Sequence, residues 1–286
     1  KSFSRSMIFP ALSMRECESG RIGCGDAGGK GTGDLRSSVT RFFVAIILLA
    51  GFLGPVSAGA QTVIATTPWT AAFAELAGAE NVELLAPYEM RHPPEYELRA
   101  NDLRRVQDAD LLVYAGYENM MDRLQDAIGD ESVDSVRIST GYNEARIESE
   151  SMKIASAIGT ENIARERISE VGSFLDTWRQ EIREHGLDEA AVVTHFHQES
   201  LFETLRANVV DTFGPGPLEA QQIARLSREE PALVVDNWHN EVAQPLAETL
   251  PSVPMVSLIT FPGEGDTRTI LDVLRYNRNK LNEALR

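Results

Sequence analysis

Residues 190–197 are Ala-Ala-Val-Val-Thr-His-Phe-His, an apolar run that ends in two histidines. A short run of this kind, rich in β-branched residues, predicts a buried strand of a parallel sheet. Alternate side chains of an extended segment point to the same face, so we expect His195 and His197 on one side of the chain. The segment therefore predicts a buried sheet with a pair of imidazoles at its carboxyl end.

The same pattern recurs along most of the chain, where short apolar runs alternate with segments of helical spacing. Strands are predicted at 62–66, 82–86, 111–115, 190–194, 208–212, 232–236 and 255–260. Helices are predicted at 68–78, 100–109, 198–206, 217–228, 241–250 and 267–285. Strands that alternate with helices favour parallel sheets with helical crossovers. We therefore predict an α/β fold of two lobes, 61–147 and 187–286, each a parallel sheet flanked by helices.

A long stretch without proline joins the two predicted lobes. Between Glu148 and His185, apolar side chains recur near helical spacing. We expect one long helix over 148–186, bent near Gly159 or Gly172, because a flexible linker would be short and rich in Gly, Pro or Ser. His185 precedes a glycine and is expected to cap the end of this helix, where a cation suits the helix dipole.

The beginning of the chain differs in composition from the rest. Residues 1–35 are rich in glycine and serine, and we exclude them from the fold prediction. Two arginines then precede the apolar run 42–53, and small residues follow it up to Ala60, which is typical of a signal peptide over 36–60. The run is shorter than the about 20 residues that span a bilayer. We therefore expect export to the periplasm with cleavage after Ala60.

Charge and cysteine content narrow the classes of function. The 286 residues hold 27 Lys and Arg against 43 Asp and Glu, a formal net charge of −16. This charge argues against nucleic-acid binding, which needs a basic face for phosphates. Both cysteines, Cys17 and Cys24, lie before the predicted cleavage site, so any metal site must be built from histidine, aspartate and glutamate.

Four of the five histidines lie where open α/β folds bind their ligands. His195, His197 and His239 follow predicted strands, and His92 lies in a proline-rich loop after the strand at 82–86. Because ligands bind beyond the carboxyl ends of parallel strands, these imidazoles are expected to share one cleft between the lobes. Imidazole binds zinc and related metals, so we predict a metal site whose shell one or two carboxylates complete.

The stretch 94–118, PEYELRANDLRRVQDADLLVYAGYE, combines a loop, an Asn-Asp-Leu helix start, an Ala-Asp-Leu strand and a Gly-x-Glu loop. With 193–197, 233–239, 261–263 and 276–279, it resembles the metal-binding solute-receptor proteins of bacterial ABC transporters, the zinc and manganese receptors. The resemblance covers essentially the whole chain after the leader. It implies two α/β lobes bridged by a long helix, with a metal held in the cleft and passed to a membrane permease.

The resemblance also indicates where the ligand set differs. The first ligand histidine of the family falls on Pro94, so His92, two residues upstream, or Glu95 would replace it. The second has no counterpart near Asn143 and Glu144, and the late aspartate falls near Thr260. We predict His92, His197 and His239 as the core ligands. The candidates for a fourth ligand are His195, Glu95, Glu118 and Glu144.

A site rich in imidazole favours zinc, with copper(II), nickel or iron(II) as alternatives, and the few carboxylates disfavour manganese. Asp236 and Asn237 are expected to orient a ring nitrogen from behind the ligands, with Trp238 beside them. The expected partners are the metal ion and an ABC permease, with no nucleic acid. We expect a monomer without catalytic residues.

Two other functions use the same residues. A secreted metallohydrolase would bind zinc through these histidines and use Glu95 or Glu199 as general base, although no His-Glu-x-x-His helix is present. A receptor for a metal chelate such as haem, cobalamin or a siderophore would line the cleft with aromatic side chains. The aromatic candidates are Trp69, Tyr117, Tyr142 and Trp238.

Overall fold

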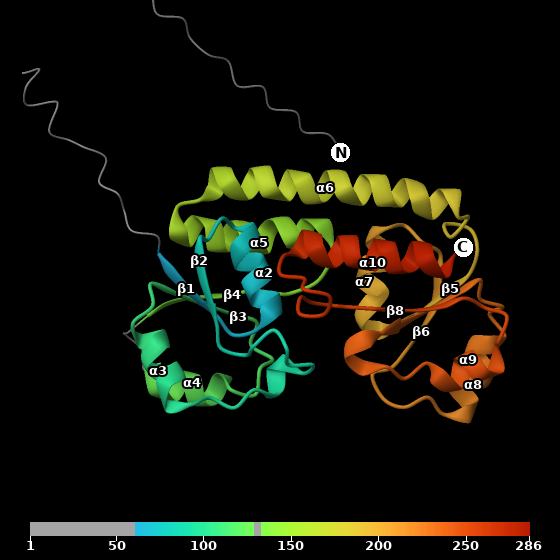
Figure 1. Cartoon of the computed structure of the whole chain (residues 1–286), viewed down its shortest axis with the longest axis horizontal. Helices are drawn as coiled ribbons and strands as arrows, with labels where there is room; N and C mark the ends of the chain where they lie inside the picture. Colours follow the sequence, from blue (N-terminus) through green and yellow to red (C-terminus); the bar gives the residue numbers. More distant parts are fainter. Residues whose placement is uncertain (1–60, 129–132) are drawn as a thin grey trace, which may run out of the picture. The chain divides into compact units, whose positions relative to one another are not determined.

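Two four-stranded parallel sheets form the framework of the computed structural model, which describes residues 61–128 and 133–286 (Figure 1). The strand order is β2-β1-β3-β4 in the first sheet and β6-β5-β7-β8 in the second. All strand pairings in both sheets are parallel. The predicted fold of two parallel sheets flanked by helices is therefore confirmed.

Within the described residues, the first lobe comprises four strands, four helices and one 3-10 turn. Its strands are β1 (Thr62–Ala65), β2 (Asn81–Leu84), β3 (Leu111–Tyr114) and β4 (Asp134–Arg137). Its helices are α2 (Pro68–Leu76), α3 (Ala100–Gln107), α4 (Met121–Ile128) and α5 (Glu144–Ile158), and the 3-10 turn is η1 (Pro93–Glu95).

The second lobe repeats this plan. Its strands are β5 (Val192–His195), β6 (Val209–Phe213), β7 (Leu233–Asn237) and β8 (Met255–Leu258). Its helices are α7 (Glu199–Thr204), α8 (Ala220–Ser227), α9 (Gln244–Thr249) and α10 (Ile270–Ala284), with the 3-10 turns η2 (Phe196–Gln198) and η3 (Trp238–Asn240). The long helix α6 (Glu161–Glu184) lies between the two lobes in the sequence.

Sequence patterns did not predict β4 and α4. The strand β4 is Asp-Ser-Val-Arg, at the edge of its sheet, and three of its four residues are exposed. An edge strand with polar side chains has neither the apolar run nor the alternation that predicts a strand. All seven strands that were predicted are present, with boundaries that differ by at most two residues.

Each sheet is covered on both faces because successive strand residues point in opposite directions. In the first lobe, Val63 belongs to a core cluster with Phe73 of α2. Its neighbour Ile64 belongs to a second cluster, with Val106 of α3 and Leu124 of α4. In the second lobe the same alternation places helix α10 on one face and helices α8 and α9 on the other.

The predicted single helix over 148–186 is wrong in its extent, because the chain turns at Gly159. This glycine ends α5 in a left-handed conformation with φ of 73°, and α6 starts two residues later and packs against α5 (Figure 1). The bridging helix is therefore α6, 24 residues or about 36 Å long, which passes through Gly172 without a break. His185 caps its C-terminus, as predicted.

One hydrophobic core runs beneath both sheets. A single cluster of buried side chains includes Val63 and Phe73 of the first lobe, Trp178 of α6, and Val235 and Leu258 of the second lobe. Trp178 is among the largest fully buried side chains. The two lobes therefore share a packed interior rather than joining through a flexible hinge.

The predicted signal peptide over 36–60 and the excluded segment 1–35 lie outside the described residues. Within 61–128 and 133–286, no helix has the length and apolar character needed to cross a membrane.

Asn277 of α10 fixes the end of strand β8. It is fully buried, its Nδ2 donates to the carbonyl oxygen of Ile259 at 2.7 Å, and its Oδ1 accepts from the Ile259 amide at 2.9 Å. We expect Asn277→Ala to lower the free energy of unfolding by about 2–4 kcal/mol, because it removes two hydrogen bonds and leaves buried backbone groups unpaired. Urea unfolding measures this change. Asn279→Ala, an exposed position on the same helix, should change stability by less than about 0.5 kcal/mol, and equal losses in both variants would contradict this role.

Candidate metal-binding site

A cleft of about 880 Å³ lies at the carboxyl ends of the strands and is lined by residues of both lobes. The first lobe contributes the loop after β2 and the segments after β3 and β4, and the second contributes the segments after β5, β7 and β8. Parallel strands place these loops at one edge of each sheet, where ligands bind in such folds. Of the predicted ligands, His92, Glu95, His197 and His239 line the cleft, and His195, Glu118 and Glu144 do not.

His239 is the buried histidine of the cleft. It follows β7 in η3 and is only 5% exposed. Its ring stacks on Phe261 with centroids 3.6 Å apart and meets the Trp238 ring edge-on at 5.0 Å. Neither ring nitrogen makes a hydrogen bond of good geometry to a described residue, although backbone groups of Phe261 and Arg91 lie near the ring and oppose the effect of burial on its pKa. Burial lowers the pKa of His239 to about 3, so at neutral pH the ring is uncharged and one nitrogen has a free lone pair.

His197 lies in η2, just after β5, and its side chain is exposed in the cleft. Its ring stacks on that of His195, with centroids 5.2 Å apart and planes inclined by 29°. Partial burial lowers the pKa of His197 below its usual value. The ring is therefore neutral at pH 7 and accessible, which suits a metal ligand.

His195 is the last residue of β5 and is fully buried. Its Nδ1 accepts from the backbone amide of His197 at 3.1 Å, and its ring fills the space that a side chain at Gly214 would need. Burial, with a smaller effect of His197, lowers the pKa of His195 to about 4. The structure therefore makes His195 the residue that shapes the turn carrying His197, and does not place it on the cleft wall.

The loop after β2 brings His92 and Glu95 to the cleft, and both side chains are exposed. His92 immediately precedes η1, and its proximity to His239 contributes to the low pKa of that ring. Arg91 ties the loop to the second lobe: it donates to the Trp238 carbonyl oxygen, pairs with Glu241 at 3.0 Å and lies 4.7 Å above the Trp238 ring.

Two predicted carboxylate ligands have structural contacts instead. Glu118 is 4% exposed and accepts from the Thr66 hydroxyl at 2.5 Å and from the amides of Ala115 at 2.9 Å and Gly116 at 2.5 Å. It therefore joins β1 to the turn after β3. Glu144, in the first turn of α5, forms an ion pair with Arg179 of α6.

The residues behind His239 hold its loop rather than its ring. The buried Asp236 carboxylate accepts from the amides of Asn237 at 2.8 Å, Val242 at 3.1 Å and Ala243 at 2.9 Å. Asn237 accepts from the Thr260 hydroxyl at 2.8 Å. The predicted contact of Asp236 or Asn237 with a ring nitrogen is not made at His239, whose ring no described side chain bonds. Trp238 contacts the ring of His239 only edge-on.

The four predicted ligands that line the cleft, His92, Glu95, His197 and His239, do not form a finished coordination shell. Among residues 61–128 and 133–286, no three His, Cys, Asp or Glu side chains lie close enough together to hold a metal ion. His92, Glu95 and His197 are exposed, so their side chains have the rotamer freedom to move, whereas His239 is fixed by its aromatic neighbours.

The sequence did not single out the basic side chains of the cleft. Arg137, the last residue of β4, and Arg146, in the first turn of α5, both line it. Arg137 lies on the strand that the apolar pattern missed, and Arg146 lies in the stretch expected to precede the bridging helix. A prediction of β4 would have placed Arg137 beside the histidines.

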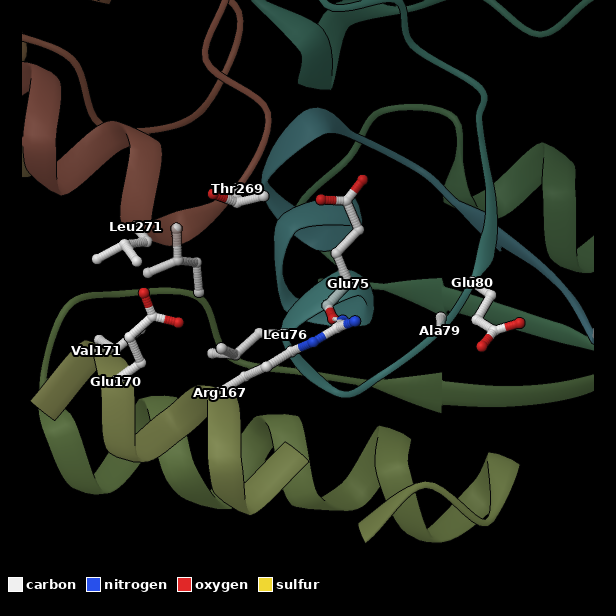
Figure 2. A pocket seen from close by; sticks show the side chains of 10 residues that line it. Glu75, Leu76, Ala79, Glu80, Arg167, Glu170, Val171, Thr269 and Leu271 are labelled. Atoms are coloured by element: carbon white, nitrogen blue, oxygen red, sulfur yellow. Dashed lines mark hydrogen bonds between the residues drawn. The ribbon is translucent and has the colours of Figure 1, made fainter. Parts of the chain in front are cut away.

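A second hollow of about 490 Å³ lies between α2, α6 and the start of α10 (Figure 2). Glu75, Glu80, Glu170 and Arg167 are among its lining side chains, and Arg167 donates to the carbonyl oxygen of Glu75. It contains no histidine, so we assign the candidate site to the larger cleft.

Known proteins resemble this chain in structure more than in sequence. No protein-family model and no curated protein matches the chain, whereas solved structures do match. The laminin-binding protein Lmb of Streptococcus agalactiae, described as having adhesin and metal-transporting activity, is 16% identical with a TM-score of 0.61 over 80% of this chain and 100% of that chain.

Two further solved structures hold a metal. The Zn(II)-bound ZnuA-like domain of AdcA from Streptococcus pneumoniae is 19% identical, with a TM-score of 0.56 over 79% of this chain and 99% of that chain. The Mn-bound periplasmic metal-binding protein of Candidatus Liberibacter asiaticus is 14% identical, with a TM-score of 0.57 over 79% of this chain and 100% of that chain. The chain therefore has the two-lobed α/β fold of these proteins.

The buried histidines predict sensitivity to acid. In the folded chain the pKa values of His195 and His239 are about 4 and about 3, against 6.5 for an unperturbed side chain. As the pH falls below 6.5, only the unfolded chain binds protons at these histidines. The contribution of the two neutral rings to the free energy of unfolding is therefore complete above pH 6.5 and is lost progressively toward pH 3. We expect a loss of up to about 1.4 kcal/mol per histidine for each pH unit.

Urea unfolding in metal-free buffer at pH 7, 6 and 5 measures this effect. His239→Leu should lose less stability between pH 7 and pH 5 than the unmodified chain, because one of the two histidines is gone. His185→Gln, at the end of α6, should keep the original pH dependence. An unchanged slope in His239→Leu would show that this ring is already accessible to protons.

Glu118→Gln tests the structural role of that carboxylate. The neutral amide of glutamine accepts weaker hydrogen bonds from the two backbone amides than a carboxylate does, and its NH2 group has no partner. We therefore expect a loss of about 1–3 kcal/mol in the free energy of unfolding. Glu97→Gln, at an exposed position of the same lobe, should have little effect. Loss of metal binding without loss of stability in Glu118→Gln would instead make Glu118 a ligand.

Proposed function

We propose that this protein is an extracytoplasmic solute-binding protein that captures a divalent transition metal and delivers it to an ABC permease. Zinc is the metal that we propose. The observation that carries the proposal is His239, a buried, neutral imidazole on the wall of a cleft between two α/β lobes, whose ring nitrogens make no hydrogen bond of good geometry to a described residue. A buried polar group without a hydrogen-bond partner is destabilising unless a ligand satisfies it.

We assign His92, His197 and His239 as the protein ligands, with Glu95 as the fourth. All four line the cleft, and the three imidazoles favour zinc over manganese. His239 would be the fixed ligand, and the exposed His92, Glu95 and His197 would close around the ion. His195 would act as a positioning residue through its bond to the His197 amide.

A carrier is favoured over a metallohydrolase. Both carboxylates suggested as general bases, Glu95 and Glu199, line the cleft, so their positions alone do not separate the two functions. The three proteins of similar fold are described by metal binding or metal transport. A transport protein of this kind needs an exported chain and a permease, and the signal peptide expected over 36–60 agrees with export. We propose that the protein acts as a monomer.

Zinc content of the exported protein, purified without a histidine tag, tests the function. We expect about one zinc ion per chain by mass spectrometry, and a higher melting temperature when zinc is added to stripped protein, because a ligand that binds only the folded state stabilises it. His197→Ala and His239→Ala should each weaken zinc binding at least about tenfold, the equivalent of about 1.4 kcal/mol.

His185→Ala serves as the matched control, because this histidine lies at the end of α6 and not in the cleft. It should bind zinc like the unmodified protein. Protein that purifies without metal and melts at the same temperature with and without zinc would refute the proposal. Zinc-dependent turnover of ester or phosphate substrates would favour the hydrolase instead.

A further inference from the structure

The cleft is much larger than a bare ion requires. Its volume is about 880 Å³, whereas one water molecule occupies about 30 Å³ in the liquid. Pockets of about 300–1,000 Å³ accommodate small organic molecules. The exposed positions of His92, Glu95 and His197 agree with a ligand wider than a single ion.

Two arginines on the cleft wall have no carboxylate partner among the described residues. The Nε of Arg137 donates to the Ala115 carbonyl oxygen at 3.1 Å, and the Nη1 of Arg146 donates to the Thr140 carbonyl oxygen at 3.3 Å. Neither forms an ion pair within 61–128 and 133–286, although Arg91 on the same cleft pairs with Glu241. Each guanidinium keeps donors available in a chain whose net charge is −16.

Two glycines on the cleft wall leave space for the guanidinium groups, because a side chain at either position would clash with an arginine. A side chain at Gly116 would place its Cβ 2.6 Å from the Nε of Arg137, and one at Gly141 would place its Cβ 2.9 Å from the Nη1 of Arg146. Gly116 and Gly141 themselves line the cleft. The two guanidinium groups therefore lie against the glycine backbone of the wall, and both side chains are exposed and accessible to a ligand.

Aromatic side chains complete the lining. Trp69 and Phe261 contact each other with ring centroids 6.1 Å apart, and both line the cleft. Tyr117 and Phe196 also line it, with 48% and 53% of their surfaces exposed. Exposed rings next to arginines suit the carbon skeleton and the carboxylates of one small organic anion.

From these observations we infer that the cleft takes the metal as a complex with a small polycarboxylate. His239 would occupy a coordination position that the complex leaves open, and Arg137 and Arg146 would bind its carboxylates through paired N–H donors. This inference rests on the proposed metal-binding function and gives its substrate class. It also accounts for the separation of the candidate ligands in this structure, where no three described His, Cys, Asp or Glu side chains lie close enough to hold an ion, because the complex brings oxygen ligands of its own.

Equilibrium dialysis with labelled zinc and labelled citrate tests the inference, with the free zinc concentration held constant. We expect citrate to increase the zinc retained by the protein and to be retained with it in a ratio near one, with little retention of citrate alone. A site for the bare ion would retain the same zinc with and without citrate, and no citrate.

Arg137→Gln and Arg146→Gln should each weaken retention of zinc with citrate about tenfold, the effect of one charged hydrogen-bonding partner, and leave retention of zinc alone unchanged. Arg137→Lys should lie between, since it keeps the charge and loses the paired donors. Arg104→Gln, an exposed position on α3, is the matched control and should behave like the unmodified protein. Melting temperatures measured in parallel show which variants are folded.

The outcomes separate the two proposals. Zinc retention that citrate does not increase, and that neither arginine variant lowers when citrate is present, would overturn the inference and leave the metal-binding function intact. Citrate retained without zinc would show an anion site and also overturn it. Absence of zinc binding in both arms would refute the proposed function together with the inference.

Discussion

One hydrophobic core packs against both sheets and holds the two lobes together. Trp178 of α6 packs in the same buried cluster as Val63 of the first lobe and Leu258 of the second. Separating the lobes would expose large apolar side chains, each worth about 1.5–3 kcal/mol when buried. The Tyr142 hydroxyl, which donates to the Thr260 carbonyl oxygen at 2.8 Å, adds a buried link across the same boundary. The two walls of the cleft are therefore held at a fixed separation. The exposed side chains of the cleft, rather than the lobes, must move to contact a ligand.

The sequence predicted those parts of the fold that depend on burial. Strands such as Leu233–Asn237 are apolar because helices cover both faces of the sheet, and that pattern is visible without a structure. The edge strand Asp134–Arg137 is covered less and was missed. The division between α5 and α6 was suggested by Gly159, but only packing of the two helices against each other shows that the chain reverses there.

For the candidate site, the sequence allowed us to predict which residues reach the cleft, but not which hydrogen bonds their side chains make. Residues directly after buried strands had to reach the cleft, which is why His197 and His239 were placed there from the sequence. Glu118 follows β3 and Asp236 lies near the end of β7, but both carboxylates already accept hydrogen bonds from backbone amides. A carboxylate that accepts hydrogen bonds from a turn and one that binds a metal can stand at the same distance along the chain from the end of a strand. Their difference lies in the donors that surround them in the fold.

A single fixed imidazole cannot select a metal by geometry, because selectivity among divalent metals depends on the number and arrangement of ligands. His239 is held by Phe261, whereas the other candidate ligands are exposed. The unpaired arginines of the cleft supply the missing selectivity in another form, since they favour a metal complex that carries negative charge. The acidic surface attracts cations in general, and the local charge of the cleft decides which of them, and in which complex, is kept.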